Sequence, residues 1–459
     1  MGALVGAPRT AVAFGLEDVS DRCRDHVLTT KEHGHVLTNL NVWTPDSGAV
    51  VYDTRSADDR FDGIRIEEVD VVTGQVRELF RATGGAHCGA VTCAPDGSHV
   101  VFILGPEHPT PDWTYGTTRR CGWMVSRAQP GAGTALDAEG YAPPFVAGVL
   151  RGGSHVHVFS PDGTRISFTY EDEVLAQLDA RADAPEHDPN QRNVGVALLD
   201  GGPVRVPPTH PRSHDGSAFS VLVTRTVAKP RPGSDEISRA FEEGWVGTRG
   251  YRKPDGSWQQ RALAFQGRVV AADGREHAEV FIVDLPDDLR RPGAGPLAGT
   301  TTRRPAPPAD VRQRRLTFTD TRERRGLASV PRHWLRCAPD GSAIAFLLPN
   351  EDGAAQLWTV SPNGGPMHPI GHGAPAVAST FTWSPDGRWI ACIRDGSVCA
   401  TEVASGRTLR LTARRDPPHD PQPYACVFAP DGRRIAYTRR VGEWAQVCVV
   451  EVGPDLLSR

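Results

Sequence analysis

Residues 381–394 read FTWSPDGRWIACIR, two short apolar runs joined by Pro-Asp-Gly, and this phrase decides the fold. Proline presets φ, aspartate can bond its own backbone, and glycine supplies a left-handed residue, so the phrase predicts a β-hairpin. Similar phrases recur elsewhere, with their turn prolines at Pro45, Pro95, Pro161, Pro339 and Pro430. A hairpin repeated in this way indicates a repeat architecture.

Each hairpin is followed by two more strand-like runs, as at 397–403 and 407–412. Four strands per repeat are typical of a β-propeller blade. The long interval between Pro161 and Pro339 has room for one degenerate blade, which we place at 207–329. The sequence therefore predicts an all-β, seven-bladed propeller of four-stranded blades. A further Pro-Asp-Gly at 254–256 leaves an eighth blade as the alternative.

The expected organisation is an N-terminal extension over 1–25 and a single propeller domain over 26–459. The blades are expected at about 38–80, 86–140, 150–206, 207–329, 330–371, 377–412 and 424–452. The last blade lacks room for a fourth strand, so we expect 26–30 (HVLTT) to supply it and close the ring. The polar loop 179–192 is expected to be a disordered or surface insertion.

Composition excludes several classes of function. A formal net charge of −4 and few lysines give no whole-protein field that favours nucleic acid. No window has the apolar length of a membrane span, and the N-terminal stretch is a poor secretory signal. The nine cysteines include no CxxC pair and several lie in strand patterns, so we expect free thiols and a cytoplasmic location. The expected partner is a small molecule, glycan or protein, and neither nucleic acid nor membrane.

The hairpin repeats resemble those of TolB-type propellers with PD40 repeats. A closer resemblance, to the YidR-like family of uncharacterised bacterial propellers, covers nearly the whole chain. The stretches that carry it include LTNLNVWTPDS (37–47), VLRGGSHVHVFSPDG (149–163), GSDEISRAFEEGWVG (233–247), RRLTFT (314–319) and VPRHWLRCAPDG (330–341). The resemblance implies a cytoplasmic propeller without an established activity. The chain departs from that pattern in its longer N-terminus and in extra residues around 251–258.

The run HVHVFSP at 155–161 is similar to a blade opening of oligogalacturonate lyases. That resemblance implies a manganese site of histidines and a glutamine at one mouth of the channel.

Candidate site residues follow from ring geometry, because the residues just before each innermost strand converge at one mouth. Counting back six positions from the turn prolines gives Asn39, His155 and His333, and His87 and His157 lie close to equivalent positions. His155 and His157 are expected to point the same way, since side chains alternate along a strand. The sequence predicts that His155, His157 and His333 bind a divalent metal such as Mn, Zn, Fe or Ni. The alternative is that each histidine bonds backbone of a neighbouring blade.

A short helical insertion is predicted near 234–245, with Ser234 as its N-cap. Glu236 and the neighbouring carboxylates could complete a site at the mouth, or the helix could be a solvated cap.

Two functions remain open at this point. The first is a binding or scaffold propeller whose mouth recognises a small molecule, a glycan fragment or a peptide. The alternative is a metal-dependent lyase or hydrolase acting on an acidic sugar, in which a metal binds the substrate carboxylate and a histidine takes the adjacent proton.

Overall fold

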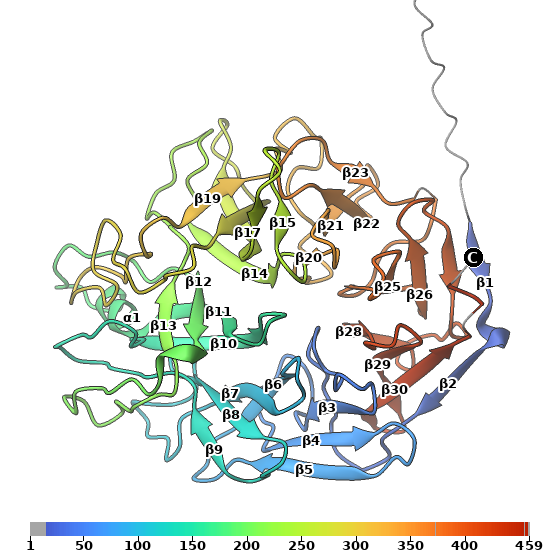
Figure 1. The fold of residues 1–459 in the computed structure, drawn as a ribbon, viewed down its shortest axis with the longest axis horizontal. Coiled ribbons are helices and arrows are strands. Elements are labelled where there is room, and N and C mark those ends of the chain that lie inside the picture. Colours follow the sequence, from blue (N-terminus) through green and yellow to red (C-terminus); the bar gives the residue numbers. More distant parts are fainter. Residues whose placement is uncertain (1–14, 372, 454, 458–459) are drawn as a thin grey trace, which may run out of the picture.

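A computed structural model describes residues 15–371, 373–453 and 455–457. Seven sheets are arranged like blades around a central axis, with the chain running once around the ring (Figure 1). The prediction of a seven-bladed, all-β propeller is confirmed. Among the described residues no helix is long and apolar enough to cross a membrane.

The first four blades hold the N-terminal two thirds of the chain. Blade 1 contains β3 (Ala49–Asp53), β4 (Arg65–Asp70) and β5 (Val76–Arg81). Blade 2 contains β6 (Cys88–Cys93), β7 (His99–Leu104), β8 (Cys121–Ser126) and β9 (Gly133–Ala135). Blade 3 contains β10 (Gly152–Phe159), β11 (Arg165–Asp172), β12 (Asn193–Leu198) and β13 (Phe219–Leu222). Blade 4 contains β14 (Arg239–Trp245), β17 (Ala262–Val270), β18 (Glu276–Asp284) and β19 (Arg312–Arg315). A separate hairpin is formed by β15 (Tyr251–Arg252) and β16 (Trp258–Gln259).

Three further blades complete the ring. Blade 5 contains β20 (Arg336–Cys337), β21 (Ile344–Pro349), β22 (Ala355–Val360) and β23 (His368–Pro369). Blade 6 contains β24 (Thr382–Trp383), β25 (Trp389–Arg394), β26 (Ser397–Glu402) and β27 (Thr408–Arg410), and β1 (Leu16–Asp18) adds a parallel strand outside β27. Blade 7 contains β28 (Pro421–Phe428), β29 (Arg434–Val441) and β30 (Trp444–Val452).

The ring closes through β2 (Cys23–Val27), which pairs antiparallel with β30 as the fourth strand of blade 7. Closure by an N-terminal strand is confirmed, but the strand lies three residues earlier than the expected 26–30. The reason is Thr29, whose hydroxyl accepts a hydrogen bond from Val447 N (2.9 Å) and donates one to Gln446 (2.8 Å). These side-chain bonds replace strand pairing, so the backbone leaves the sheet after Leu28.

Four Pro-Asp-Gly turns pack on the turn of the preceding blade, where a Cβ on the glycine would meet the proline ring; the glycines are Gly97, Gly163, Gly387 and Gly432. Gly97 has φ +72°, and a Cβ there would lie 2.9 Å from Cδ of Pro45. Glycine is therefore required both for the turn conformation and for the close approach between blades. Asp431 N donates to Ser47 Oγ (3.0 Å) and joins the turns of blades 7 and 1 in the same way.

The predicted helix over 234–245 is wrong. Arg239–Trp245 forms β14, the innermost strand of blade 4, and Ser234 donates its hydroxyl to Arg231 O (2.7 Å) instead of capping a helix. Pairing with β17 overrides the helical preference of the local sequence, as tertiary context often does. The α-helix among the described residues is α1 (Glu173–Asp179), whose N-terminal amide of Leu175 bonds the Asp172 carboxylate (3.0 Å).

Blade 4 also begins later than expected. The expected blade 4, over 207–329, includes Phe219–Leu222, but this segment pairs with β12 and is the outer strand of blade 3. Blade 3 needs a fourth strand at the outer edge of β12. A long connection after Leu198 separates β12 from this strand, so blade 3 extends beyond the expected boundary at residue 206.

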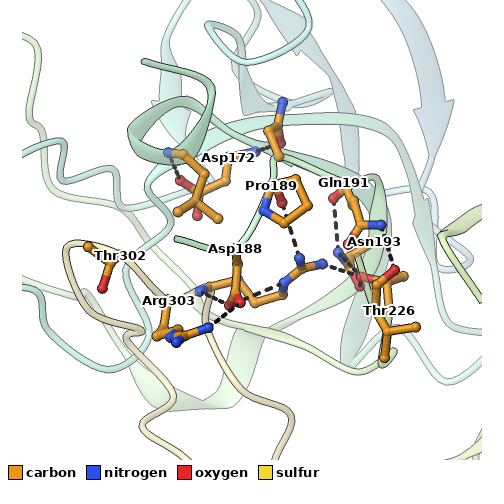
Figure 2. A network of polar contacts seen from close by, with 12 residues as sticks. Asp172, Asp188, Pro189, Gln191, Asn193, Thr226, Thr302 and Arg303 are labelled. Atoms are coloured by element: carbon orange, nitrogen blue, oxygen red, sulfur yellow. Dashed lines mark hydrogen bonds and ion pairs between the residues drawn. The ribbon is translucent and has the colours of Figure 1, made fainter. Parts of the chain in front are cut away.

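The loop 179–192 lies at the surface but is fixed by polar contacts rather than disordered (Figure 2). Asp188 N donates to Thr302 O (2.9 Å), and its carboxylate accepts a bond from Arg303 Nη1 (3.1 Å). Arg304 donates to Pro189 O (3.1 Å). Two insertions, one from blade 3 and one from blade 4, therefore hold each other in place.

Removing residues 1–28 deletes β1 and β2 and exposes the edge of β30. We expect the thermal midpoint to fall by more than about 5 °C and aggregation to increase, because an unpaired strand edge templates association. Differential scanning fluorimetry and light scattering measure both effects. A chain that begins at Gly15 keeps both strands and serves as the control, and an equal midpoint for the two truncations would contradict the assigned closure.

Candidate binding site at the channel mouth

Two cavities lie along the propeller axis. The first, about 400 Å³, is an apolar chamber beside the hairpin turns, lined by Trp43, Trp245 and Trp383 and by turn prolines of several blades. The second, about 420 Å³, lies where the inner strands begin, and we call it the mouth pocket. Six blades contribute to its wall, and the lining residues used below are Asn39, Asp58, Asp59, Phe61, Tyr115, Arg120, His155, Arg332 and Trp334.

The mouth pocket contains a buried arginine without a counter-charge. Arg120 is 8% exposed, and its guanidinium donates through Nη1 to the Tyr115 hydroxyl (3.1 Å). Its Nε is buried without a hydrogen-bond partner. Across the described residues, no carboxylate oxygen lies within 4.0 Å of this guanidinium. Burial lowers the pKa of Arg120 below its usual value, the expected effect on a cation removed from water.

His155 lies in the same electropositive wall. It is buried, and its Nδ1 is 3.4 Å from Thr169 O. Burial, followed by the charges of Arg120 and Arg192, lowers the pKa of His155 well below its usual value. The imidazole is therefore neutral at pH 7, so the positive charge of this wall comes from guanidinium groups.

Arg332 marks the other side of the pocket and is paired. Its Nε donates to Glu242 Oε1 (2.8 Å), and its guanidinium lies 4.4 Å from the centroid of the Trp334 ring. Glu242 takes a left-handed backbone conformation (φ 55°) at a bulge in β14, which aims its carboxylate at Arg332. Arg332 is thus held in position while Arg120 stays available.

The structure separates the three histidines of the predicted metal site. Val156 has φ 54° at a bulge in β10, so the alternation of side chains breaks and His157 turns away from His155. His157 Nε2 lies 2.9 Å from Ser154 Oγ and 3.6 Å from Asp137, fully buried. The expectation that His155 and His157 point the same way is wrong.

His333 is engaged on both ring nitrogens. Its Nδ1 lies 3.2 Å from Pro331 O, and its Nε2 accepts a hydrogen bond from Leu347 N (3.2 Å). It lines a different cavity, of about 440 Å³, beside blades 4 and 5. These positions do not fit one ion shared by His155, His157 and His333.

Of the remaining predicted site residues, Asn39 lies at the mouth pocket, whereas His87 and Glu236 lie elsewhere. Asn39 lines the mouth pocket, and its Oδ1 accepts a hydrogen bond from Arg336. His87 is half-buried before β6, and its carbonyl accepts from Gly105 N (2.8 Å). Glu236 pairs with Arg231 (3.0 Å). Neither His87 nor Glu236 is among the described residues that line the mouth pocket.

Sequence reasoning missed Arg120 and Tyr115, and it included Glu243 only as one of the carboxylates of a predicted helix over 234–245. Arg120 and Tyr115 come from the connection between β7 and β8, where the repeat predicts no converging residues. Glu243 is buried in β14, and its Oε2 accepts a bond from Thr169 Oγ1 (2.9 Å) while Oε1 has no partner. Burial raises the pKa of Glu243 to about 7. A carboxylate inside a stretch that reads as a solvated helix gave no signal for this.

Comparison with known proteins identifies relatives and similar folds. The chain is 44% identical over 413 residues to the "Uncharacterized protein YidR" of Escherichia coli, covering 89% of this chain and 94% of that protein. The family described as "Protein of unknown function (DUF3748)" matches residues 87–214. An oligogalacturonate lyase in complex with manganese has TM-score 0.57 and 12% identity, and covers 96% of both chains. A second oligogalacturonate lyase, from Vibrio parahaemolyticus, has TM-score 0.53 and 9% identity, again over 96% of both chains. At these identities the two lyases show a shared fold alone.

Glu243→Gln tests whether the buried carboxyl group of Glu243 titrates near neutral pH. Because burial raises the pKa of Glu243 from 4.5 to about 7, protonation favours the folded state, and this contribution is lost as pH rises through 7. We expect the wild-type chain to lose up to about 3 kcal/mol of stability relative to the glutamine variant between pH 4.5 and 8. Thermal midpoints across that range measure the difference. Parallel pH profiles for the two proteins would show that Glu243 does not titrate near neutrality.

Proposed function

The chain belongs to the family of the uncharacterized Escherichia coli protein YidR, and we propose from the mouth pocket that it binds a small acidic saccharide there. The observation that carries the proposal is Arg120, a buried guanidinium without a counter-charge in the wall of a cavity. An uncompensated buried cation costs several kcal/mol, and a ligand carboxylate would offset that cost with charge-assisted hydrogen bonds.

Other residues that line the mouth pocket support a ligand with hydroxyl groups. Asp58 and Asp59 line the pocket and can accept hydrogen bonds from hydroxyls. Phe61 stacks on Tyr115 with ring centroids 4.2 Å apart and an interplanar angle of 7°, which gives a flat aromatic surface beside Arg120. A cavity of about 420 Å³ lies in the size range of small-ligand pockets. One or two sugar rings with a carboxylate combine these requirements.

The lyase alternative is supported by fewer observations. The two structural neighbours are named for oligogalacturonate, an acidic saccharide, and one of them is in complex with manganese. In this chain His155 faces guanidinium groups, and His157 and His333 are engaged elsewhere, so the mouth does not fit a histidine-bound metal. We therefore propose recognition rather than metal-assisted elimination. The free cysteines favour a reducing compartment, and we propose the cytoplasm.

Calorimetric titration of the full chain with digalacturonate and with its neutral counterpart, digalactose, tests the proposal. We expect the acid to bind at least about tenfold more tightly, and Arg120→Gln to weaken its binding by about 10- to 100-fold, the usual effect of losing a charge-assisted hydrogen bond. Arg81→Gln, at an exposed arginine paired with Glu78, is the matched control and should bind as wild type.

Two results would contradict recognition of an acidic saccharide. The first is equal affinity for the acidic and neutral disaccharides, and the second is unchanged binding in Arg120→Gln. Ultraviolet absorbance of the same mixtures detects an unsaturated product. Its appearance would establish turnover and restore the lyase alternative.

A further inference from the structure

Away from the mouth, His33, His35 and Glu67 bring metal-ligating atoms together at the seam between blades 1 and 7. Two imidazole nitrogens and one carboxylate oxygen all lie within 4.8 Å of one another. His35 is fully buried, Glu67 is 1% exposed, and the His33 side chain is 20% exposed. We call these three residues the seam cluster.

The backbone around Gly34 places the two histidines on one side. A Cβ at Gly34 would lie 1.8 Å from the carbonyl oxygen of Arg55, so only glycine allows this approach. Val36 then bridges to Asp53 in blade 1. The His33 and His35 rings stack with centroids 4.4 Å apart and an interplanar angle of 21°.

Hydrogen bonds fix the tautomer of both imidazoles. His35 Nδ1 lies 2.9 Å from Ala445 O, and His33 Nδ1 lies 3.0 Å from Gly34 O. A carbonyl oxygen only accepts, so each Nδ1 carries the proton and each Nε2 keeps a lone pair. Both Nε2 atoms are buried without a hydrogen-bond partner.

Glu67 supplies the negative charge. Its Oε2 accepts a hydrogen bond from the Tyr52 hydroxyl (2.8 Å) and lies 4.0 Å from His33 Nε2. Its Oε1 lies 3.3 Å from Arg65 Nε, which leaves one oxygen directed at the imidazoles. Tyr52 orients the carboxylate from the outside, as hydrogen-bonded groups around a metal site commonly do.

We propose that the seam cluster binds one divalent transition-metal ion, with His33 Nε2, His35 Nε2 and a Glu67 oxygen as protein ligands. Two imidazoles and a carboxylate suit ions such as Zn²⁺, Mn²⁺ or Fe²⁺. Ligand atoms about 2.1 Å from such an ion lie about 3.4 Å apart, so the present spacing closes with side-chain movements of about 1 Å. The ion would satisfy two buried lone pairs that the protein itself leaves without partners.

Two other groups of potential ligands in the described chain lack this property. In His277, Glu279 and Asp320 the imidazole nitrogen near the carboxylates already has a partner, because His277 Nε2 lies 3.1 Å from Glu279 Oε1. In the second group, of Cys121, Glu139 and His214, the imidazole nitrogen also has a carboxylate partner, because His214 Nε2 lies 3.2 Å from Glu139 Oε2.

The position of the seam cluster gives the ion a structural consequence. His33 and His35 precede the first blade, whereas Ala445, which holds His35, belongs to β30 of the last blade. A bound ion would fix the loop before blade 1 against Glu67 in that blade while His35 stays bonded to blade 7. Because binding to the folded state alone adds stability, the ion should raise the thermal midpoint.

The test uses the full chain, dialysed against a chelator and then titrated with Zn²⁺ by calorimetry and with Co²⁺ by visible spectroscopy. We expect one ion per chain, a Co²⁺ spectrum of nitrogen and oxygen ligands without a thiolate band, and a higher thermal midpoint with Zn²⁺. His33→Ala and Glu67→Gln should each weaken Zn²⁺ binding at least tenfold. His33 is partly exposed, so its variant tests the site even if His35→Ala does not fold.

Two variants serve as controls. His187→Ala removes a partly exposed histidine paired with Asp179 and should bind Zn²⁺ as wild type does. His214→Ala removes the histidine of the cysteine-containing cluster and should also leave binding unchanged. Binding that survives in His33→Ala but is lost in His214→Ala would overturn the proposal, as would the absence of stoichiometric binding by the wild-type chain.

Discussion

The pairing of β2 with β30, five residues on each side, is the interaction on which the rest of the structure depends. It joins the beginning of the chain to its last blade and turns a row of sheets into a closed ring. Only in a closed ring do the starts of the inner strands converge, which creates the mouth pocket. The same pairing brings the loop before blade 1 against β30, where Ala445 holds His35. Both proposed sites are therefore products of closure.

The two sites have opposite electrostatic deficits. At the mouth, the guanidinium of Arg120 lacks an anion, whereas at the seam the lone pairs of His33 and His35 lack a cation. Folded proteins rarely leave buried polar atoms without partners, because each such atom costs free energy. The complementary species can be read directly from the sign of each deficit: a carboxylate at the mouth and a metal ion at the seam.

The fold was predictable because the hairpin signal is local. Six turns with the same chemistry predict six blades, and their spacing reveals the seventh. The prediction of a helix at 234–245 was wrong because the segment becomes a strand only through its pairing with β17 in blade 4. Its local sequence gives no sign of that partner. Counting back from the turn prolines placed Asn39 and His155 at the mouth, but the bulge at Val156 that redirects His157 arises from packing. Arg120 was missed because it follows an irregular connection without a repeat signal.

The distance along the chain between β2 and β30 has a consequence for biosynthesis. Residues 23–27 leave the ribosome early, yet their strand partner at 444–452 is made last. Throughout translation the N-terminal strand has no sheet to join, and every intermediate blade folds in an open arc with one exposed end. Completion of the chain is therefore the event that seals the ring, and a ribosome that stalls before blade 7 would release a protein with two unpaired edges, a natural substrate for chaperones and proteases.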